Sequence, residues 1–150
     1  MSELQLSRTT HDRLRTEFED LTSRGRIELA EKIERAREEG DLKENAGYHA
    51  AKDEQGHMEG RIRQLEYLLE TAEVVDSCPV YTFVYEGDTE DMAERYLIGH
   101  IEEQPADGVE VMGRDSPLGS ALVDSSPGDT VTYEAPGGTM SVTVLDVEWV

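Results

Sequence analysis

A regular seam of apolar residues in the first half of the chain is the feature that most constrains its fold. The seam repeats at alternating spacings of four and three residues over three heptads. Its positions are Ala51, Gln55, Met58, Ile62, Leu65, Leu69 and Ala72. This spacing is typical of a helix that packs along its whole length against another helix. The sequence therefore predicts a long helix with a helical partner.

A second helical pattern, from about His11 to Glu39, supplies that partner. Thr9 or Thr10 can cap its start, and its apolar spacing predicts a slip in phase near Gly25. The apolar positions are Leu14, Phe18, Leu21, Ile27, Ala30 and Ile33. Because only a short turn separates the two patterns, the helices must pack antiparallel. We expect an antiparallel helical hairpin with its tip at about residues 39–48.

The tip itself carries two carboxylates. Gly40 is a natural helix stop, Asp41 stands where the next helix should be capped, and Glu44 follows three residues later. One interpretation is a capping box, in which both carboxylates stabilise the helix start. The other is that Asp41 and Glu44 hold a divalent cation. Since magnesium prefers six oxygen ligands, two carboxylates would need a partner to complete such a site.

The pattern changes after Val75 to short strand-like segments separated by turns. Predicted strands are 80–85, 95–101, 109–112, 130–133 and 140–150. A short helix is predicted from Ser116 to Leu122, with Ser116 as the N-cap and Pro117 at the first position. The chain is therefore predicted to be α+β: a coiled-coil hairpin over residues 1–76, then a small antiparallel sheet domain with one helix over residues 77–150.

Charge narrows the classes of partner. The net charge is −20; residues 1–75 hold 12 Lys and Arg against 18 Asp and Glu, whereas residues 76–150 hold 2 against 16. Because Lys and Arg bind the phosphates of nucleic acids, direct nucleic-acid binding by the C-terminal half is not expected, and neither is independent DNA binding. The acidity fits a basic protein partner or, equally, solubility or adaptation to intracellular salt. Cys78 is the only cysteine, and no apolar run is long enough to span a membrane. We expect a cytoplasmic protein.

Standard enzyme motifs are absent, so the candidate residues lie on the second helix. His49, Asp53 and His57 share one helix row, which is acceptable spacing for metal ligands. The seam places this row on the outward face, however, so solvated polar residues are the favoured interpretation. Other candidates are Tyr48, for stacking on a base or a protein groove, and the basic Lys52, Arg61 and Arg63, for steering a nucleic-acid 3′ end toward the tip. A solvated ionic face is the plain alternative for the basic residues.

Two long runs resemble the signatures of the bacterial GreA/GreB transcript cleavage factors. The first is residues 40–56, Gly-Asp-Leu-Lys-Glu-Asn-Ala-Gly-Tyr-His-Ala-Ala-Lys-Asp-Glu-Gln-Gly, followed by Glu59-Gly60-Arg61-Ile62. The second comprises Ser116-Pro117-Leu118-Gly119-Ser120-Ala121-Leu122, Gly128-Asp129-Thr130-Val131 and Pro136-Gly137-Gly138. The resemblance spans nearly the whole chain.

The resemblance implies a fold, a partner and a set of site residues. It implies an FKBP-like second domain that docks on RNA polymerase at the secondary channel through Ser116, Pro117 and Leu118. It also implies that Asp41 and Glu44 help the polymerase to hold its second Mg²⁺ while the polymerase cleaves backtracked RNA. Contacts with the nascent RNA 3′ end or the channel are expected from Tyr48, Lys52 and Arg61. The factor would act as a monomer and would not be an enzyme by itself.

Three alternatives remain at the level of sequence. Relatives of these factors occupy the same channel and inhibit the polymerase. In this chain, the retained Asp41 and Glu44 argue for cleavage over inhibition. A peptidyl-prolyl isomerase would need an aromatic-lined apolar pocket in the second domain. A coiled-coil dimerisation module would use the seam between chains. The family also commonly has an acidic residue where this chain has Gly47.

Overall fold

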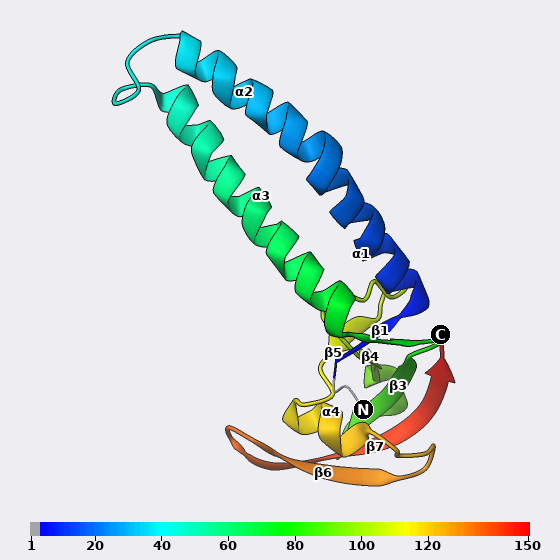
Figure 1. Cartoon of the computed structure of the whole chain (residues 1–150). Coiled ribbons are helices and arrows are strands. Elements are labelled where there is room, and N and C mark those ends of the chain that lie inside the picture. The colour runs from blue at the N-terminus through cyan, green and yellow to red at the C-terminus, as the bar shows by residue number, and fades with distance from the viewer. Residues whose placement is uncertain (1–3) are drawn as a thin grey trace. The chain divides into compact units, whose positions relative to one another are not determined.

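The computed structural model describes residues 4–150, which fall into two compact units (Figure 1). One unit is His11–Ala72, and the other combines residues 4–10 with Glu73–Val150. Residues 4–10 belong with the second part of the chain because a strand pair joins them to the residues that follow the hairpin.

A helical hairpin forms the first unit. Its first arm contains α1 (Arg8–Asp20), the π-helical turn η1 (Leu21–Gly25) and α2 (Arg26–Glu38), and its second arm is α3 (Ala46–Thr71). Ala51, Ile62 and Leu65 of the predicted seam are buried. Ion pairs also connect the arms, with Arg26 bound to Glu59 at 2.8 Å and Lys32 bound to Glu54 at 2.7 Å. The predicted long helix and its antiparallel partner are therefore both present.

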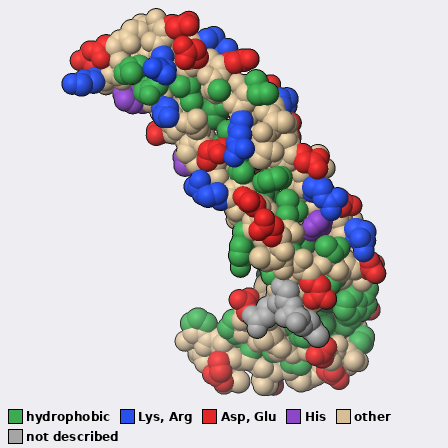
Figure 2. All heavy atoms as spheres, viewed as in Figure 1, with side chains coloured by type: hydrophobic (Ala, Val, Ile, Leu, Met, Phe, Trp, Pro, Cys, Tyr) green, Lys and Arg blue, Asp and Glu red, His purple; other side chains and the backbone are tan. Residues whose placement is uncertain are grey.

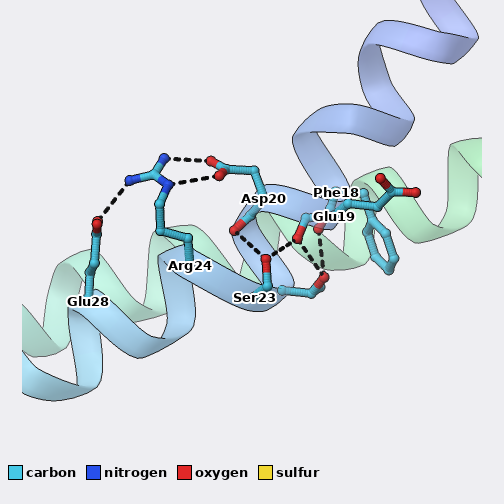
Figure 3. A network of polar contacts seen from close by, with 7 residues as sticks. Phe18, Glu19, Asp20, Ser23, Arg24 and Glu28 are labelled. Atoms are coloured by element: carbon cyan, nitrogen blue, oxygen red, sulfur yellow. Dashed lines mark hydrogen bonds and ion pairs between the residues drawn. The ribbon is translucent and has the colours of Figure 1, made fainter.

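The predicted slip in phase is confirmed as the π-helical turn η1. A π turn holds an extra residue, which leaves backbone carbonyls without their usual partners. Thr22 Oγ1 donates to the Phe18 carbonyl at 2.8 Å, and Ser23 Oγ donates to the Glu19 carbonyl at 2.6 Å. Arg24 spans the turn by binding Asp20 on one side and Glu28 on the other, at 2.7 and 2.9 Å (Figure 3).

The extra residue in η1 changes which residues of the first arm face the second arm. The apolar spacing predicts that Ile27 and Ala30 face the second helix, but both are exposed, Ile27 by 60%. Leu29 and Ala36 are buried in their place. Within η1, a Cβ atom on Gly25 would lie 3.3 Å from Met58 Sδ, so the absence of a side chain there lets the arms approach closely.

A five-stranded sheet forms most of the second unit, in the order β5-β4-β3-β7-β6. Its strands are β3 (Pro79–Tyr85), β4 (Glu94–Ile98), β5 (Glu110–Met112), β6 (Thr130–Ala135) and β7 (Gly138–Trp149), with the short helices η2 (Glu90–Met92) and α4 (Pro117–Leu122). Most pairs are antiparallel, as predicted, but β4 and β5 are parallel. Phe83, Val142 and Val144 are fully buried in the core that the sheet and α4 share.

A small parallel pair of strands ties the start of the chain to the second unit. Strand β1 (Gln5–Ser7) pairs with β2 (Glu73–Val75). Glu103, which is only 7% exposed, accepts hydrogen bonds from Ser7 N at 2.9 Å, Ser7 Oγ at 2.6 Å and Thr10 Oγ1 at 2.8 Å. Ser7 Oγ in turn accepts from Thr10 N, so Ser7 caps α1 and the predicted caps Thr9 and Thr10 are wrong.

Figure 2 shows the charges on one face of the molecule, where Lys and Arg side chains are interspersed with Asp and Glu along the hairpin. Among the helices described in residues 4–150, none combines the length and apolar character needed to cross a membrane.

Candidate functional site at the hairpin tip

The tip is an exposed turn between the two arms of the hairpin. Helix α2 ends at Glu38, and Gly40 has a φ of +136°, a conformation that side chains disfavour. Residues 39–44 are all exposed. Gly40 is therefore confirmed as the stop of the first arm, and the turn beyond it exposes its side chains to solvent.

The predicted cap of the second arm is wrong. Helix α3 begins at Ala46, and its N-cap is Asn45, whose Oδ1 accepts from Tyr48 N at 3.0 Å. Asp41 instead accepts from Lys43 N at 3.0 Å through Oδ1, which closes a local turn four residues before the cap. The spacing of Asp41 and Glu44 matches a capping box, but the two carboxylates lie in the turn and the helix starts without them.

Their position leaves these carboxylates accessible. Asp41 commits one oxygen to the Lys43 amide, and Glu44 is exposed in the same turn. Carboxylate oxygens are ligands that magnesium accepts, but two side chains supply too few to fill its shell. Within residues 4–150, no group of three or more His, Cys, Asp and Glu side chains is arranged to hold a metal ion. Asp41 and Glu44 are therefore two accessible carboxylates that are too few to form a magnesium site on their own.

Asn45 is the tip residue that sequence reasoning missed. In addition to capping α3, its Nδ2 donates to the Ala36 carbonyl in the last turn of α2. Next to it, His49 Nε2 lies 3.2 Å from the Lys43 carbonyl, which makes this nitrogen the donor. An Asn directly before a helical run is a common N-cap arrangement and was the available signal for Asn45. For His49, the sequence offers either a metal ligand in a row with Asp53 and His57 or a solvated polar residue, and neither reading predicts this hydrogen bond.

The three predicted RNA or channel contacts differ in their surroundings. Tyr48 is half-buried in the first turn of α3 and packs edge-on against His49, with ring centroids 5.7 Å apart. Lys52 is exposed, and its Nζ donates to Gln55 Oε1 at 2.8 Å within the helix. Arg61 is different, because its guanidinium binds Glu17 of the opposite arm. An RNA contact by Arg61 would compete with that ion pair.

Of the three predicted docking residues, Ser116, Pro117 and Leu118, the first and the last make contacts within the second unit. Ser116 Oγ accepts from Gly119 N at 3.1 Å and donates to the Gly113 carbonyl at 2.8 Å, which confirms Ser116 as the N-cap of α4. Leu118 is 6% exposed and belongs to the core, so its side chain is not available for docking without a rearrangement. Pro117 is the one predicted docking residue of the three that is exposed.

A pocket in the second unit bears on the isomerase alternative. Its volume is about 700 Å³, and its lining includes Tyr81, Ile98 and Trp149. Burial raises the pKa of the Tyr81 hydroxyl. Phe83 is fully buried and does not line this pocket. The lining of this pocket therefore includes two aromatic side chains, whereas the isomerase alternative calls for an aromatic-lined apolar pocket.

Taken together, the fold and the site define a protein with a long helical hairpin, acidic residues at its tip and a mixed-sheet domain after it. Two family models match: "Transcription elongation factor, N-terminal" over residues 4–74, and "Transcription elongation factor, GreA/GreB, C-term" over residues 82–149. The chain belongs to the GreA/GreB family of transcription elongation factors.

Curated relatives agree with this assignment. The transcription elongation factor GreA of Saccharopolyspora erythraea is 46% identical over 99% of this chain and 98% of its own. The GreA proteins of Rhodococcus erythropolis and Mycobacterium tuberculosis are 44% and 43% identical over 95% of this chain and 93% of theirs. Among solved structures, Gfh1 of Thermus aquaticus is 21% identical with a TM-score of 0.45, covering 99% of both chains.

Proposed function

We propose that this protein binds RNA polymerase at its secondary channel and stimulates the polymerase's own cleavage of backtracked RNA. The observation that carries the proposal is the pair of exposed carboxylates, Asp41 and Glu44, at the tip of a hairpin in a GreA/GreB family member. Helix α3 has 26 residues and is therefore about 39 Å long. An arm of this length can deliver the tip into a narrow channel while the rest of the protein stays outside.

In this proposal the tip residues complete a site that the polymerase begins. Asp41 and Glu44 would hold Mg²⁺ together with carboxylates of the polymerase. In two-metal hydrolysis the ions activate the attacking water and stabilise the leaving oxygen. The chain's own contribution is to bring negative charge and oxygen ligands to the Mg²⁺ beside the polymerase carboxylates. The catalytic centre itself belongs to the polymerase. The protein is accordingly an activator and not an enzyme by itself.

Other residues would guide the transcript and hold the factor in place. Tyr48 and Lys52 lie in the first two turns of α3, directly after the acidic turn, and offer an aromatic face and a positive charge to the RNA 3′ end. Pro117 offers an exposed apolar contact at the start of α4 for docking on the polymerase. We assign Arg61 to the hairpin, because Glu17 already occupies its guanidinium.

The direct test is transcript cleavage in a stalled, backtracked elongation complex with a bacterial polymerase and magnesium. The wild-type protein should shorten the RNA, while Asp41→Ala and Glu44→Ala should bind the polymerase without shortening it. Slowed nucleotide addition without shortening by the wild-type protein would contradict the proposal and would identify a secondary-channel inhibitor.

A further inference from the structure

The turn that carries Asp41 and Glu44 has little packing of its own. Residues 39–44 are all exposed, so no buried side chain fixes the shape of this turn. Short exposed turns of this kind sample many backbone conformations unless hydrogen bonds restrict them. The hydrogen bonds that reach into or across the turn therefore decide whether its carboxylates keep a defined geometry.

One side chain joins the two ends of the turn. Asn45 Nδ2 donates to the carbonyl of Ala36, in the last turn of α2, and Asn45 Oδ1 accepts from Tyr48 N, in the first turn of α3. The two bonds use the opposite ends of one amide group, so its orientation is fixed by a donor on one side and an acceptor on the other. Asn45 is half-buried, which limits competition from water.

A second side chain holds the middle of the turn. His49 Nε2 donates to the Lys43 carbonyl, while Lys43 N donates to Asp41 Oδ1. His49 lies on α3, one turn beyond the cap, so this bond connects the acidic turn to the rigid helix. Asn45 and His49 together link the turn to both arms. We refer to this pair of residues as the tip clasp.

We propose that Asn45 is a positioning residue that, with His49, holds Asp41 and Glu44 in the geometry needed to share a magnesium ion with the polymerase. This inference rests on the proposed function. Preorganisation matters here, because ligands held in place lose less conformational entropy when the metal binds. Without the tip clasp the carboxylates remain present, but the turn that carries them is looser.

Substitutions at Asn45 separate its two bonds. Asn45→Asp keeps an oxygen that can cap α3 but loses the donor to Ala36, and it places a carboxylate against that carbonyl. Asn45→Ser also keeps a capping oxygen, adds no charge and is too short to reach Ala36. If added negative charge alone mattered, Asn45→Asp would improve magnesium use and Asn45→Ser would not change it. If positioning matters, both variants lose function.

The experiment has two readouts on the full-length protein. The first is backbone ¹⁵N relaxation of residues 40–45 in the free protein, which should show increased nanosecond motion in Asn45→Asp, Asn45→Ser and His49→Ala. The second is the Mg²⁺ concentration for half-maximal transcript cleavage, which should rise at least fivefold in the Asn45 variants. The factor concentration for half-maximal effect, which reports polymerase binding, should change less than twofold.

Glu39→Gln is the matched control, because Glu39 is an exposed charged residue in the same turn outside the tip clasp. It should change neither the relaxation data nor the magnesium requirement. Unchanged relaxation and unchanged magnesium requirement in both Asn45 variants would overturn the inference, as would an equal loss in Glu39→Gln. If the wild-type protein stimulates no cleavage, the proposed function fails. The relaxation data then still decide whether Asn45 orders the turn.

Discussion

The guanidinium of Arg61 binds both carboxylate oxygens of Glu17 across the hairpin. Arg61 Nε lies 2.7 Å from Glu17 Oε2, and Arg61 Nη2 lies 2.9 Å from Glu17 Oε1. Both side chains are partly shielded, with 26% and 33% of their surfaces exposed. Two parallel charge-assisted bonds of this kind are stronger than an ordinary surface ion pair and fix the relative position of the partners. Arg61 therefore stabilises the packing of the two arms.

A double-mutant cycle measures this contribution. Arg61→Gln and Glu17→Gln should each lower the free energy of unfolding, with a coupling energy of about 1 kcal/mol between them. Urea unfolding followed by far-UV circular dichroism gives the four stabilities. Arg35→Gln combined with Glu17→Gln is the control pair and should be additive. Additivity of the Arg61 and Glu17 variants would show that the ion pair contributes nothing to stability.

Gly119→Ala should destabilise the second unit strongly. A Cβ atom at this position would collide with the Gly113 carbonyl oxygen and lie 2.6 Å from Ser116 Oγ. Because Gly119 is buried against that backbone, we expect a loss of about 3 kcal/mol or more. Thermal unfolding should show it, and Gly137→Ala, with open space around its Cβ, should have little effect. A small effect at Gly119 would mean that the loop before α4 can move aside.

Gly56→Ala should stabilise the hairpin. Gly56 lies in the interior of α3 and is exposed, and a Cβ atom added there would meet nothing within 4 Å. Alanine restricts the unfolded chain and favours the helix, so we expect a gain of about 1 kcal/mol. The midpoint of urea unfolding should rise accordingly. A lower midpoint would indicate that this face of α3 packs against something in solution.

The stability of the second unit should fall at alkaline pH because of Cys78. Burial raises the pKa of its thiol to about 11, and the nearby Glu103 acts in the same direction. Between the ordinary value of 9.0 and about 11, the folded state keeps a proton that the unfolded state has lost. Raising the pH through this window therefore lowers the free energy of unfolding.

Cys78→Ala isolates the contribution of the thiol. Urea unfolding at pH 8, 9, 10 and 11 should show a steeper loss of stability for the wild-type protein than for the variant. Tyr81, Tyr85 and Tyr96 also have raised pKa values, but they act equally in both proteins. Parallel curves would mean that the thiol ionises as readily in the folded state as in the unfolded one.

Much of the hairpin could be predicted because its pattern is local and regular. The seam from Ala51 to Ala72 specifies a helix by spacing alone. The apolar spacing also predicts a slip in phase near Gly25, and the structure has its π turn there. The residues of the first arm that face this seam are harder to predict. An extra residue in η1 rotates everything beyond it, so Ile27 faces solvent and Leu29 is buried. Strands β1 and β2 have three residues each, and the hairpin separates them in sequence. No local pattern therefore indicates that they pair.

The candidate site was predictable in its residue types and not in its contacts. Asp41 and Glu44 were identified as an acidic pair, but their spacing also matches a capping box, and backbone geometry was needed to show that Asn45 holds the cap instead. The positive charge of Arg61 and the family resemblance predict a contact with RNA or the channel, and the resemblance alone predicts a docking contact at Leu118. Sequence alone does not reveal that Arg61 binds Glu17 or that Leu118 is buried in the core.

The measurement that tests the central claim most directly is the magnesium dependence of transcript cleavage at saturating factor. Wild-type protein should be compared with Asp41→Asn, Glu44→Gln and the control Asp53→Asn, which changes an exposed carboxylate on α3. We predict that the first two variants need at least tenfold more Mg²⁺ for half-maximal cleavage and that the control matches the wild type. The same magnesium requirement in all four proteins would contradict a role for the tip carboxylates in holding the metal.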